Sequence, residues 1–511
     1  MRTRTNFSLC AALLLSGSLA VAQSGIGPVT HSVPNARQRV GNPASVIAAG
    51  YSLRRVVDGT FSLENPSGVI TNYGFLSTGT LTEPDENTYL AFSSNPGGPT
   101  QGYDYGRHFV FQGHENSGNL AYITRVNLDV ADPAHKITPL TPPDPVSGLT
   151  NFNSIDGSTY DPFTNTLLFT QEAGTNGGVI QVTPSWPPAV NTLYGIIGRG
   201  GYEGIHPDDW GNLLIIEDSG GTSVNVDPND PNSPKVARQP NSFVFRFLPK
   251  DSTNLSLGGK LQALRVAING TPIVFNANDP AGDTFALAQL ALHTPGTSYP
   301  VDWVTVHDTD IDGFASFGAN AAAKKAGATP FKRPENAQFL PGSGFFTFFF
   351  DPTGDTDAGS GNTPALAARG SWGSIFRVDL AQDRNTGKIS IFVLGDADHA
   401  SFDNLTFADD HTLLVAEDRG DTLHLQLNTL DSVWAFATDG SAAPRRFIAL
   451  GRDSLSVSAG EDNEPTGLHV SVGGTSAADL PGTLNNLVDS RAFLSRQHGF
   501  NQLWEIVKDP D

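Results

Sequence analysis

Three stretches of the sequence align without gaps and decide the fold: Leu167–Gly174 (LLFTQEAG), Leu213–Gly220 (LLIIEDSG) and Leu413–Gly420 (LLVAEDRG). Each begins with two leucines, continues as a short apolar run, reaches a carboxylate and stops at glycine. Consecutive apolar residues are typical of a strand that is buried on both faces. The carboxylates therefore stand at the ends of buried strands.

A second acid lies about ten residues upstream of each of these strands and is followed by a small or amide residue. These pairs are Asp156-Gly157, Glu203-Gly204 and Asp403-Asn404; Glu335-Asn336 precedes a further apolar strand, and a weaker copy begins at Glu464. The shortest step between copies, from 156 to 203, is 47 residues. This step is close to the roughly 40–50 residues of a propeller blade, and the longer steps predict insertions.

The repeat predicts an all-β fold, a β-propeller of about six blades with long insertions between blades. A four-stranded blade cannot bury its faces alone, so blades pack radially and direct their innermost strands to a central channel. Acids at the same place in several blades would then converge on one axis. For any single copy an ordinary turn explains an acid beside glycine better, but four or five copies in register favour the propeller.

Length and composition exclude several other classes of protein. The chain has 511 residues, of which 38% are hydrophobic and 16% charged, which excludes a disordered acidic tail protein and a coiled coil. Its 54 glycines and 35 prolines indicate many turns and few long helices. The net charge of −21 disfavours nucleic acids and anionic membranes as partners and favours cations. No apolar run is long enough to span a membrane.

Residues 1–22 have the pattern of a cleaved signal peptide. Arg2 and Arg4 form a basic start, Leu9–Leu15 is apolar, and Ala20–Ala22 is a cleavage site of small residues. The two arginines are not adjacent, which favours the general secretory route over the twin-arginine route.

Removal of this segment leaves residues 23–511 as a single propeller domain with insertions near 221–300 and 351–371. It also removes the only cysteine, Cys10. A lipid anchor on Cys10 is the competing interpretation, but Leu9 is bulky where a lipidated cysteine follows a small residue. We expect a monomer that is secreted or periplasmic and has no disulfide, thiolate metal site or cysteine nucleophile.

Carboxylates around a channel supply the oxygen ligands that hard cations need, which favours calcium. Asp308–Gly313 (DTDIDG) has the head of a calcium loop, but the twelfth position is Ala319, which excludes an EF-hand. The segment is either a single calcium loop or an Asp-rich turn, and the same two alternatives hold for Asp351, Asp355 and Asp357.

Arg333-Pro334-Glu335 combines a basic residue with one of the repeated acids. The proline is expected to keep the chain extended, so that Arg333 and Glu335 point the same way. An arginine beside a metal-binding carboxylate suits a phosphate ester, because its planar fork grips two oxygens while the metal polarises the phosphorus. A simple Arg–Glu ion pair explains the same residues. The sequence has neither a nucleophile elbow nor a phosphate-binding Gly-rich loop with lysine.

Six short motifs follow one another along the chain. They are Gly113–Asn116 (GHEN), Thr170–Glu172 (TQE), Glu203-Gly204 with Glu217-Asp218, Lys332–Glu335 (KRPE), Phe402–Leu405 (FDNL) with Glu417-Asp418, and Glu464–Gly467 (EPTG). In this order and spacing they resemble the motifs of the PhoX-like alkaline phosphatases, over roughly residues 100–475.

The resemblance implies a secreted bacterial β-propeller phosphomonoesterase whose axial carboxylates hold calcium and iron. It implies that Arg333 contacts phosphate and that Glu335 binds metal, and these two are the candidate catalytic residues. The candidate metal ligands are Glu115, Glu172, Glu203, Asp218, Glu335, Asp403 and Asp418. Gln171 stands where the family has a metal-binding cysteine, which disfavours Fe³⁺ and favours more than one Ca²⁺.

The resulting hypothesis is a secreted calcium-dependent phosphoric ester hydrolase that acts on small phosphate esters. One alternative is a calcium propeller that cleaves lactones or carboxylic esters, with an axial acid and Asn404 as the relevant pair. Another is a non-catalytic calcium-stabilised propeller whose insertions bind a protein or a glycan. Loss of the cysteine favours the binding protein, and Arg333 beside Glu335 favours the phosphatase.

Overall fold

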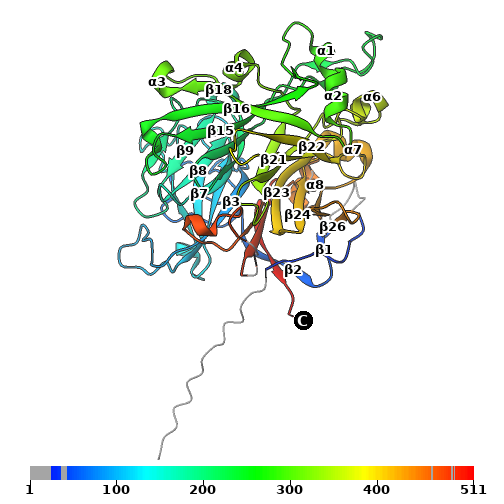
Figure 1. The fold of residues 1–511 in the computed structure, drawn as a ribbon. Coiled ribbons are helices and arrows are strands. Elements are labelled where there is room, and N and C mark those ends of the chain that lie inside the picture. The colour runs from blue at the N-terminus through cyan, green and yellow to red at the C-terminus, as the bar shows by residue number, and fades with distance from the viewer. Residues whose placement is uncertain (1–24, 36–42, 462–463, 485–486, 488, 511) are drawn as a thin grey trace, which may run out of the picture.

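The computed structural model describes residues 25–35, 43–461, 464–484, 487 and 489–510. The predicted signal peptide, 1–22, lies outside the described residues. Strands dominate the fold, and the helices are short segments between them (Figure 1). The prediction of an all-β, propeller-like fold is confirmed. No helix in the described ranges is long and apolar enough to cross a membrane.

The strands group into six antiparallel sets, which we call blades 1 to 6, each written from its innermost strand outward. Blade 1 is β3 (Glu83–Ala91), β4 (His108–Glu115), β5 (Tyr122–Asn127) and β6 (Ile137–Pro139); blade 2 is β7 (Ile155–Asp161), β8 (Thr166–Gln171), β9 (Gly178–Val182) and β10 (Val190–Thr192); blade 3 is β11 (Tyr202–Pro207), β12 (Leu213–Glu217), β15 (Val244–Pro249) and β16 (Gly259–Ile268).

The second half of the chain repeats the pattern. Blade 4 is β19 (Pro334–Phe339), β20 (Thr347–Pro352), β21 (Ser374–Leu380) and β22 (Thr386–Leu394); blade 5 is β23 (Phe402–Asp409), β24 (Thr412–Glu417), β25 (Ser432–Ala437), β26 (Arg445–Ala449) and the short β1 (Val46–Ile47); blade 6 is β27 (Pro465–Ser471), β28 (Arg491–Arg496), β29 (Gln502–Lys508) and β2 (Tyr51–Asp58). Strand β2 comes from the N-terminal part of the chain, so both ends of the chain build blade 6.

The innermost strands form a closed ring. They contact one another in the cyclic order β3, β7, β11, β19, β23, β27 and back to β3. Strand β18 (Tyr299–Asp308) pairs with both β16 and β22, so it joins the outer edges of blades 3 and 4 into one sheet.

Each pair of neighbouring blades encloses its own hydrophobic core. Leu213 and Ile215 face blade 2, whereas Leu214 and Ile216 of the same strand face blade 4. The second strand of blade 5 divides in the same way between blades 4 and 6. Because side chains alternate between the two faces of a strand, a blade buried on both faces needs consecutive apolar residues, which explains the double leucines.

The remaining elements lie in the connections. The hairpin of β13 (Ser223–Val224) and β14 (Ala237–Arg238), together with β17 (Thr271–Pro272), α1 (Pro280–Thr284) and α2 (Leu287–Leu292), lies within residues 221–300. Helices α3 (Thr309–Asp312) and α4 (Ala319–Ala326) follow β18, α5 (Ala358–Gly361) and α6 (Pro364–Ala367) lie within 351–371, and α7 (Gly420–Leu427) and α8 (Ser454–Ala459) belong to blades 5 and 6; single 3₁₀ turns lie at Pro133–His135, Gly174–Asn176, Leu255–Leu257 and Ala477–Asp479.

The innermost strands share one irregularity. In all six, two consecutive residues oppose a single residue of the second strand, which is a β-bulge at the same place in every blade. The bulged pairs are Asp85-Glu86, Asp156-Gly157, Glu203-Gly204, Glu335-Asn336, Asp403-Asn404 and Gly467-Leu468. A bulge bends its strand and redirects a side chain, so the repeat places an acid at the bulge of five blades.

Small residues follow two of these acids because the strands approach closely. A Cβ on Gly157 would lie 2.2 Å from the carbonyl oxygen of Glu203, and one on Gly204 would lie 2.4 Å from Oδ1 and 3.1 Å from Cα of Asn336. Glycine at these positions is therefore a packing requirement of the ring.

We predict that Gly204→Ala destabilises the protein by about 1–3 kcal/mol, the usual cost of an extra methyl group in a filled site. Chemical denaturation measures the effect. Gly68→Ala is the matched control, because a Cβ there has no atom within 4 Å. Equal stabilities of the two variants would show that the strands at the axis are not packed as closely as described.

Candidate active site

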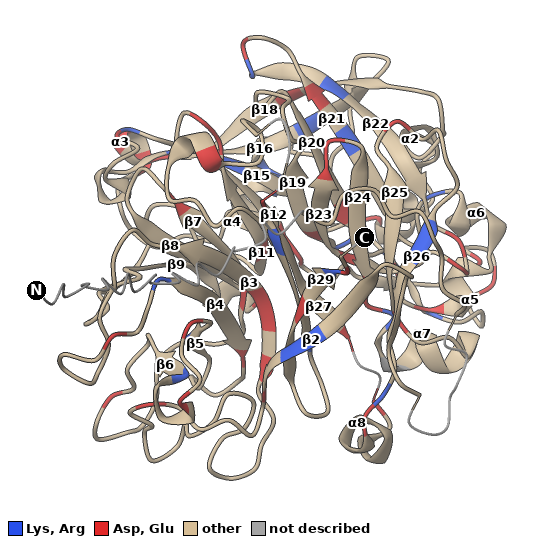
Figure 2. Ribbon diagram, turned by 90° about the horizontal axis from the view of Figure 1, so that it is seen from below, with Lys and Arg blue, Asp and Glu red and all other residues tan. Residues whose placement is uncertain are grey.

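The axis is lined by carboxylates from two recurring positions of the blades, both of which carry an acid in blades 1, 2, 3 and 5. The bulged acids are the first set, and the second set follows the end of the second strand: Glu115, Glu172, Asp218 and Asp418. The register brings the two sets together, since the residue before each bulge pairs with the residue before each strand-end acid, as Ile155 pairs with Gln171 and Tyr202 with Glu217. Seen from below, acidic segments lie on inner strands such as β3 near the middle of the molecule (Figure 2).

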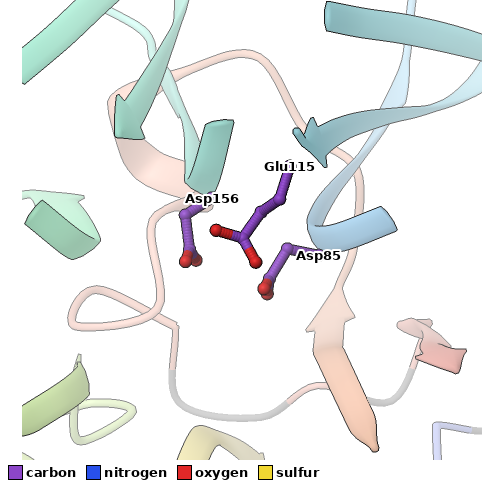
Figure 3. A group of neighbouring side chains, drawn as sticks. All are labelled: Asp85, Glu115 and Asp156. Atoms are coloured by element: carbon purple, nitrogen blue, oxygen red, sulfur yellow. The ribbon is translucent and has the colours of Figure 1, made fainter. Parts of the chain in front are cut away.

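Seven of these acids form three overlapping groups whose carboxylate oxygens lie within 4.8 Å of one another. The groups are Asp85, Glu115 and Asp156; Asp156, Glu172 and Glu203; and Glu203, Asp218 and Glu335. The first group is shown in Figure 3, where the three side chains converge from separate strands. Shared members make the three groups one continuous row across blades 1 to 4.

Five of the seven predicted metal ligands therefore meet in this row: Glu115, Glu172, Glu203, Asp218 and Glu335. The other two, Asp403 and Asp418, belong to none of the three groups. They lie close enough to interact electrostatically with the row, because Asp403 raises the pKa of Glu335, and both Asp85 and Asp418 raise that of Asp403.

Two acids of the axis were missed by the sequence analysis. Asp85 occupies the bulge of blade 1, and Glu86 follows it. The pair Glu86-Asn87 resembles the other acid-amide pairs, but residues 92–107 separate it from its second strand, so the spacing of about ten residues is lost. The weaker copy predicted at Glu464–Gly467 is blade 6, but the expected place of its acid was wrong, since the register puts Gly467, not Glu464, at the bulge.

Burial and mutual repulsion raise the pKa values of the row. Burial raises the pKa of Asp85 to about 6 and that of Glu172 to about 8, and neighbouring carboxylates add to both shifts. Burial, followed by the repulsion of nearby acids, also raises the pKa of Glu115, Asp156 and Glu203. Like charges held this close in a buried site are compensated either by protons or by a bound cation.

The donor set fits hard cations. All ligand atoms in the row are carboxylate oxygens, which calcium prefers. Oδ1 of Asp156, Oδ1 of Asp218 and Oδ2 of Asp403 are buried and accept no hydrogen bond from any described residue. Buried oxygens are rarely left without a partner in a folded protein, so these atoms have the geometry of ligand atoms that point into a metal site.

Arg333 is the basic group beside this row. Its Nε donates to Oδ2 of Asp218 at 2.8 Å, and one terminal nitrogen lies 2.7 Å from the same oxygen and 3.5 Å from Oε1 of Glu335. The side chain keeps 28% of its surface exposed. Burial alone would lower the pKa of Arg333, but Asp218 and Glu335 raise it well above its ordinary value, so the group is a fixed positive charge.

The expectation of an extended backbone at Arg333 was wrong. Its φ of 52° lies in the left-handed region, a strained conformation for this residue type. Ser154 and Ser401, which also stand two residues before a bulged acid, have φ of 38° and 55°. In all three cases the carbonyl accepts the N–H that follows the second strand, from Glu172, Thr353 or Asp418. The strained backbone conformation thus recurs at this position in three blades, and in blade 4 the residue that adopts it is Arg333.

Arg333 lines a polar cavity of about 240 Å³ together with Lys235, Arg238, Asp355 and Asp418. Val236, Thr356, Asp357 and residues 419, 420 and 422 complete the lining. The hairpin residues Lys235 and Arg238 thus share the cavity with Arg333, which is itself paired with Asp218 and Glu335 of the row, so a ligand in the cavity would contact Arg333.

Gln171 does not point its amide at the row. Its Nε2 donates to the carbonyl of Asn153 at 2.8 Å, and its Oε1 accepts the hydroxyl of Tyr194 at 2.7 Å. The equivalent Glu217 and Glu417 accept backbone N–H groups of their own blades, at Phe243 and Ala400. The side chain at this position therefore bonds within its own blade. The residue that follows it, Glu172, Asp218 or Asp418, is the one that reaches the axis.

Asn404 is also fully engaged. Its Nδ2 donates to Asp403 at 2.9 Å, and its Oδ1 accepts from the Thr466 hydroxyl at 3.2 Å and the Leu468 N–H at 3.3 Å. The residue is buried. Its contacts are those of an amide that joins blades 5 and 6.

The two Asp-rich segments hold local structure. In Asp308–Gly313, Lys260 pairs with Asp308 at 2.9 Å and Lys250 with Asp310 at 2.5 Å, and the segment forms α3. In the other, Asp351 accepts the N–H of Asn336, and Asp355 pairs with buried Lys332 at 2.8 Å. These contacts favour the Asp-rich turn over the calcium loop.

The third acid of that second segment, Asp357, caps α5 through the N–H of Gly359. No ion-binding group of three acids includes a member of either segment within the described residues.

Residues 237–471 match the family model described as alkaline phosphatase PhoX. The match covers a little less than half of the chain and lies within the stretch whose motifs resemble the PhoX-like alkaline phosphatases. The match confirms the predicted resemblance to this family. The family's enzymes are phosphoric monoester hydrolases. A comparison with curated proteins gives no match.

Among solved structures, the chain is similar to Pseudomonas fluorescens PhoX in complex with vanadate, a transition state analogue. The identity is 13% and the TM-score 0.54, with 96% of this chain and 98% of that chain covered. TolB from Acinetobacter baumannii matches with 10% identity and a TM-score of 0.32, over 84% of this chain and 65% of that chain. The PhoX structure supports the same fold over the whole chain.

We predict that the chelated protein loses stability as the pH rises from 5.5 to 8. Asp85, Glu86 and Glu172 have folded pKa values of about 6, 8 and 8 against ordinary values of 3.8 to 4.5. Between these values the folded state holds protons that the unfolded state has released, so rising pH favours unfolding. Added Ca²⁺ competes with protons for the carboxylates and should therefore raise the melting temperature more at pH 8 than at pH 5.5.

Differential scanning calorimetry on protein treated with EDTA, with and without Ca²⁺ at both pH values, measures these shifts. Melting temperatures that respond to neither pH nor Ca²⁺ would contradict the described burial of the row.

Proposed function

We propose that the protein is a calcium-dependent phosphomonoesterase whose reaction takes place where Arg333 meets the acidic row. The observation that carries this proposal is the position of Arg333. A guanidinium that is held by Asp218 and Glu335, and is still partly exposed to a polar cavity, has donors available for a phosphoryl group. The vanadate complex of the similar PhoX structure is consistent with such a group.

The row would hold the cations through Asp85, Glu115, Asp156, Glu172, Glu203, Asp218 and Glu335, and we propose Asp403 and Asp418 as further ligands. Bound Ca²⁺ would supply charge stabilisation for the phosphoryl oxygens and would favour ionisation of an attacking water.

The residues of the chain bind and position the substrate. Arg333 grips two phosphoryl oxygens and stabilises the charge that develops on them. Its position is fixed by the strained backbone and by Lys332, whose ion pair with Asp355 is buried. Preorganised donors of this kind do not have to reorient during the reaction.

The reaction is a hydrolysis that needs only water as a second reactant. The water oxygen forms the new P–O bond, and the ester P–O bond breaks with its electron pair on the leaving oxygen. That oxygen takes up one proton of the water. The products are an alcohol and inorganic phosphate.

Calcium is proposed over iron because the described ligands are oxygens alone. Thiolate is the soft ligand that would favour iron, and at the corresponding position the amide of Gln171 is engaged by Asn153 and Tyr194. Stoichiometric iron in the purified protein would contradict this part of the proposal.

We also propose that residues 1–22 direct export and that residues 23–511 act outside the cytoplasm as one domain. The basic start, apolar run and small-residue site of the N-terminus support this proposal. The absence of cysteine from residues 23–511 suits an oxidising compartment, and an all-oxygen site can acquire calcium there.

We predict calcium-dependent hydrolysis of p-nitrophenyl phosphate by the purified protein, and a fall in kcat of at least about 100-fold in Arg333→Gln, the usual cost of losing one preorganised donor. Arg377→Gln is the control, since Arg377 pairs with Asp379 on the outer strand β21 and also loses an exposed ion pair. Melting temperatures of both variants show whether they fold. Turnover that is absent with Ca²⁺ would refute the phosphatase, and equal turnover of the two variants would refute the role of Arg333.

A further inference from the structure

We propose that the hairpin of β13 and β14 makes the protein selective for phosphate esters whose leaving group carries a second anionic group. This inference rests on the proposed function and adds the class of substrate. It depends on Lys235 and Arg238, two cations of the hairpin that line the same cavity as Arg333.

The two cations differ from every other basic residue of the cavity. Arg333 is paired with Asp218, and Arg419 is buried against Glu417 at 2.8 Å. Lys235 and Arg238 are exposed and form no ion pair with a carboxylate among the described residues. The guanidinium of Arg238 instead donates to the Ser223 hydroxyl at 2.5 Å.

Three acids also line the cavity, and each has partners of its own. Asp355 is paired with Lys332 and also accepts the N–H of Arg238 at 3.2 Å. Asp357 accepts the N–H of Gly359 and the amide of Gln426, at 2.7 and 3.0 Å, and Asp418 accepts the N–H of Gly420 at 2.7 Å. In a chain with 31 basic and 52 acidic residues, Lys235 and Arg238 are therefore two cations beside Arg333 that are free to pair with an anionic ligand.

The hairpin is anchored to the rest of the protein by packing and by hydrogen bonds. Val224 and Ala237 are buried against Leu366 of α6, which anchors the paired strands. After β14, the side chain of Gln239 donates to Asp283 at 2.7 Å and to the carbonyl of Asn276 at 3.1 Å. A charge carried on an anchored hairpin loses less conformational freedom on binding than one on a free loop.

The tip of the hairpin is held by hydrogen bonds between its own residues. Asn225 donates to the carbonyl of Ser233 at 2.6 Å, and the N–H of Val226 donates to the carbonyl of Pro234 at 2.9 Å. Lys235 follows directly, so its backbone is held where the hairpin returns to β14.

Gly420 and Thr422, in the first turn of α7, also line the cavity. The positive end of the helix dipole is matched there by Asp418, whose carboxylate accepts the N–H of Gly420 at 2.7 Å. A scissile phosphate at Arg333 would therefore place its leaving group beside the two cations of the hairpin, a setting that stabilises a carboxylate or a second phosphate.

Two nearly isosteric substrates test this inference. Glycerol 3-phosphate has a neutral leaving group, and 3-phosphoglycerate has a carboxylate in nearly the same volume. We predict that the protein prefers 3-phosphoglycerate in kcat/KM by about tenfold, through KM, and that the preference disappears in the double variant Lys235→Gln/Arg238→Gln while glycerol 3-phosphate changes less than twofold. Losses of this size are typical of two rim charges at low salt.

Two further variants separate charge from structure. Lys325→Gln/Lys388→Gln removes the same charge from exposed sites elsewhere and should keep the preference. Lys235→Arg/Arg238→Lys keeps both charges and should keep it too. Equal use of both substrates by the unaltered protein, or equal losses for both in the hairpin variant, would overturn the selectivity and leave the phosphatase standing.

If no substrate is hydrolysed, the proposed function fails and binding decides the inference separately. Isothermal titration calorimetry with the same two compounds should then show tighter binding of 3-phosphoglycerate, lost in the hairpin variant. Equal affinities would overturn the inference.

Discussion

The structure depends on one constraint, the burial of seven mutually repelling carboxylates where the innermost strands meet. Without counter-charge this arrangement opposes folding, because each ionised group loses water and gains like-charged neighbours. The repeated bulge produces it by turning the same side chain inward in five blades. A divalent cation would offset this repulsion, so the geometry that opposes folding also makes the row suited to binding metal.

The rest of the architecture supports this arrangement. Six cores between blades hold the strands by hydrophobic burial that does not depend on the axis. Glu86 of blade 1 accepts the N–H of Ser158 in blade 2 and the amide of Asn336 in blade 4. These hydrogen bonds connect the innermost strands of three blades. The acidic row is therefore carried by a scaffold whose packing does not depend on a bound ion.

Sequence alone predicted the blades and most of the row, because consecutive apolar residues and strand-end acids follow from burial on both faces. It missed Asp85, since a long loop separates that bulge from its partner strand. It mistook Glu464 for the repeat position, since register is not visible in spacing. It also predicted the wrong backbone conformation for Arg333. A residue before proline is usually extended, but Arg333 has the left-handed conformation that recurs two residues before the bulged acids. The cations of the hairpin meet Arg333 only through tertiary structure.

The most direct test of the account is the calcium content of the purified protein after reconstitution and exhaustive dialysis, measured by plasma mass spectrometry. Asp156 belongs to two of the three groups of acids, so Asp156→Asn removes a shared ligand without changing side-chain volume. We predict more than one tightly bound calcium per chain in the natural sequence and a smaller number in the variant. A chain that retains no divalent cation, or a variant that retains as many as the natural sequence, would contradict the assignment of the row as a metal site.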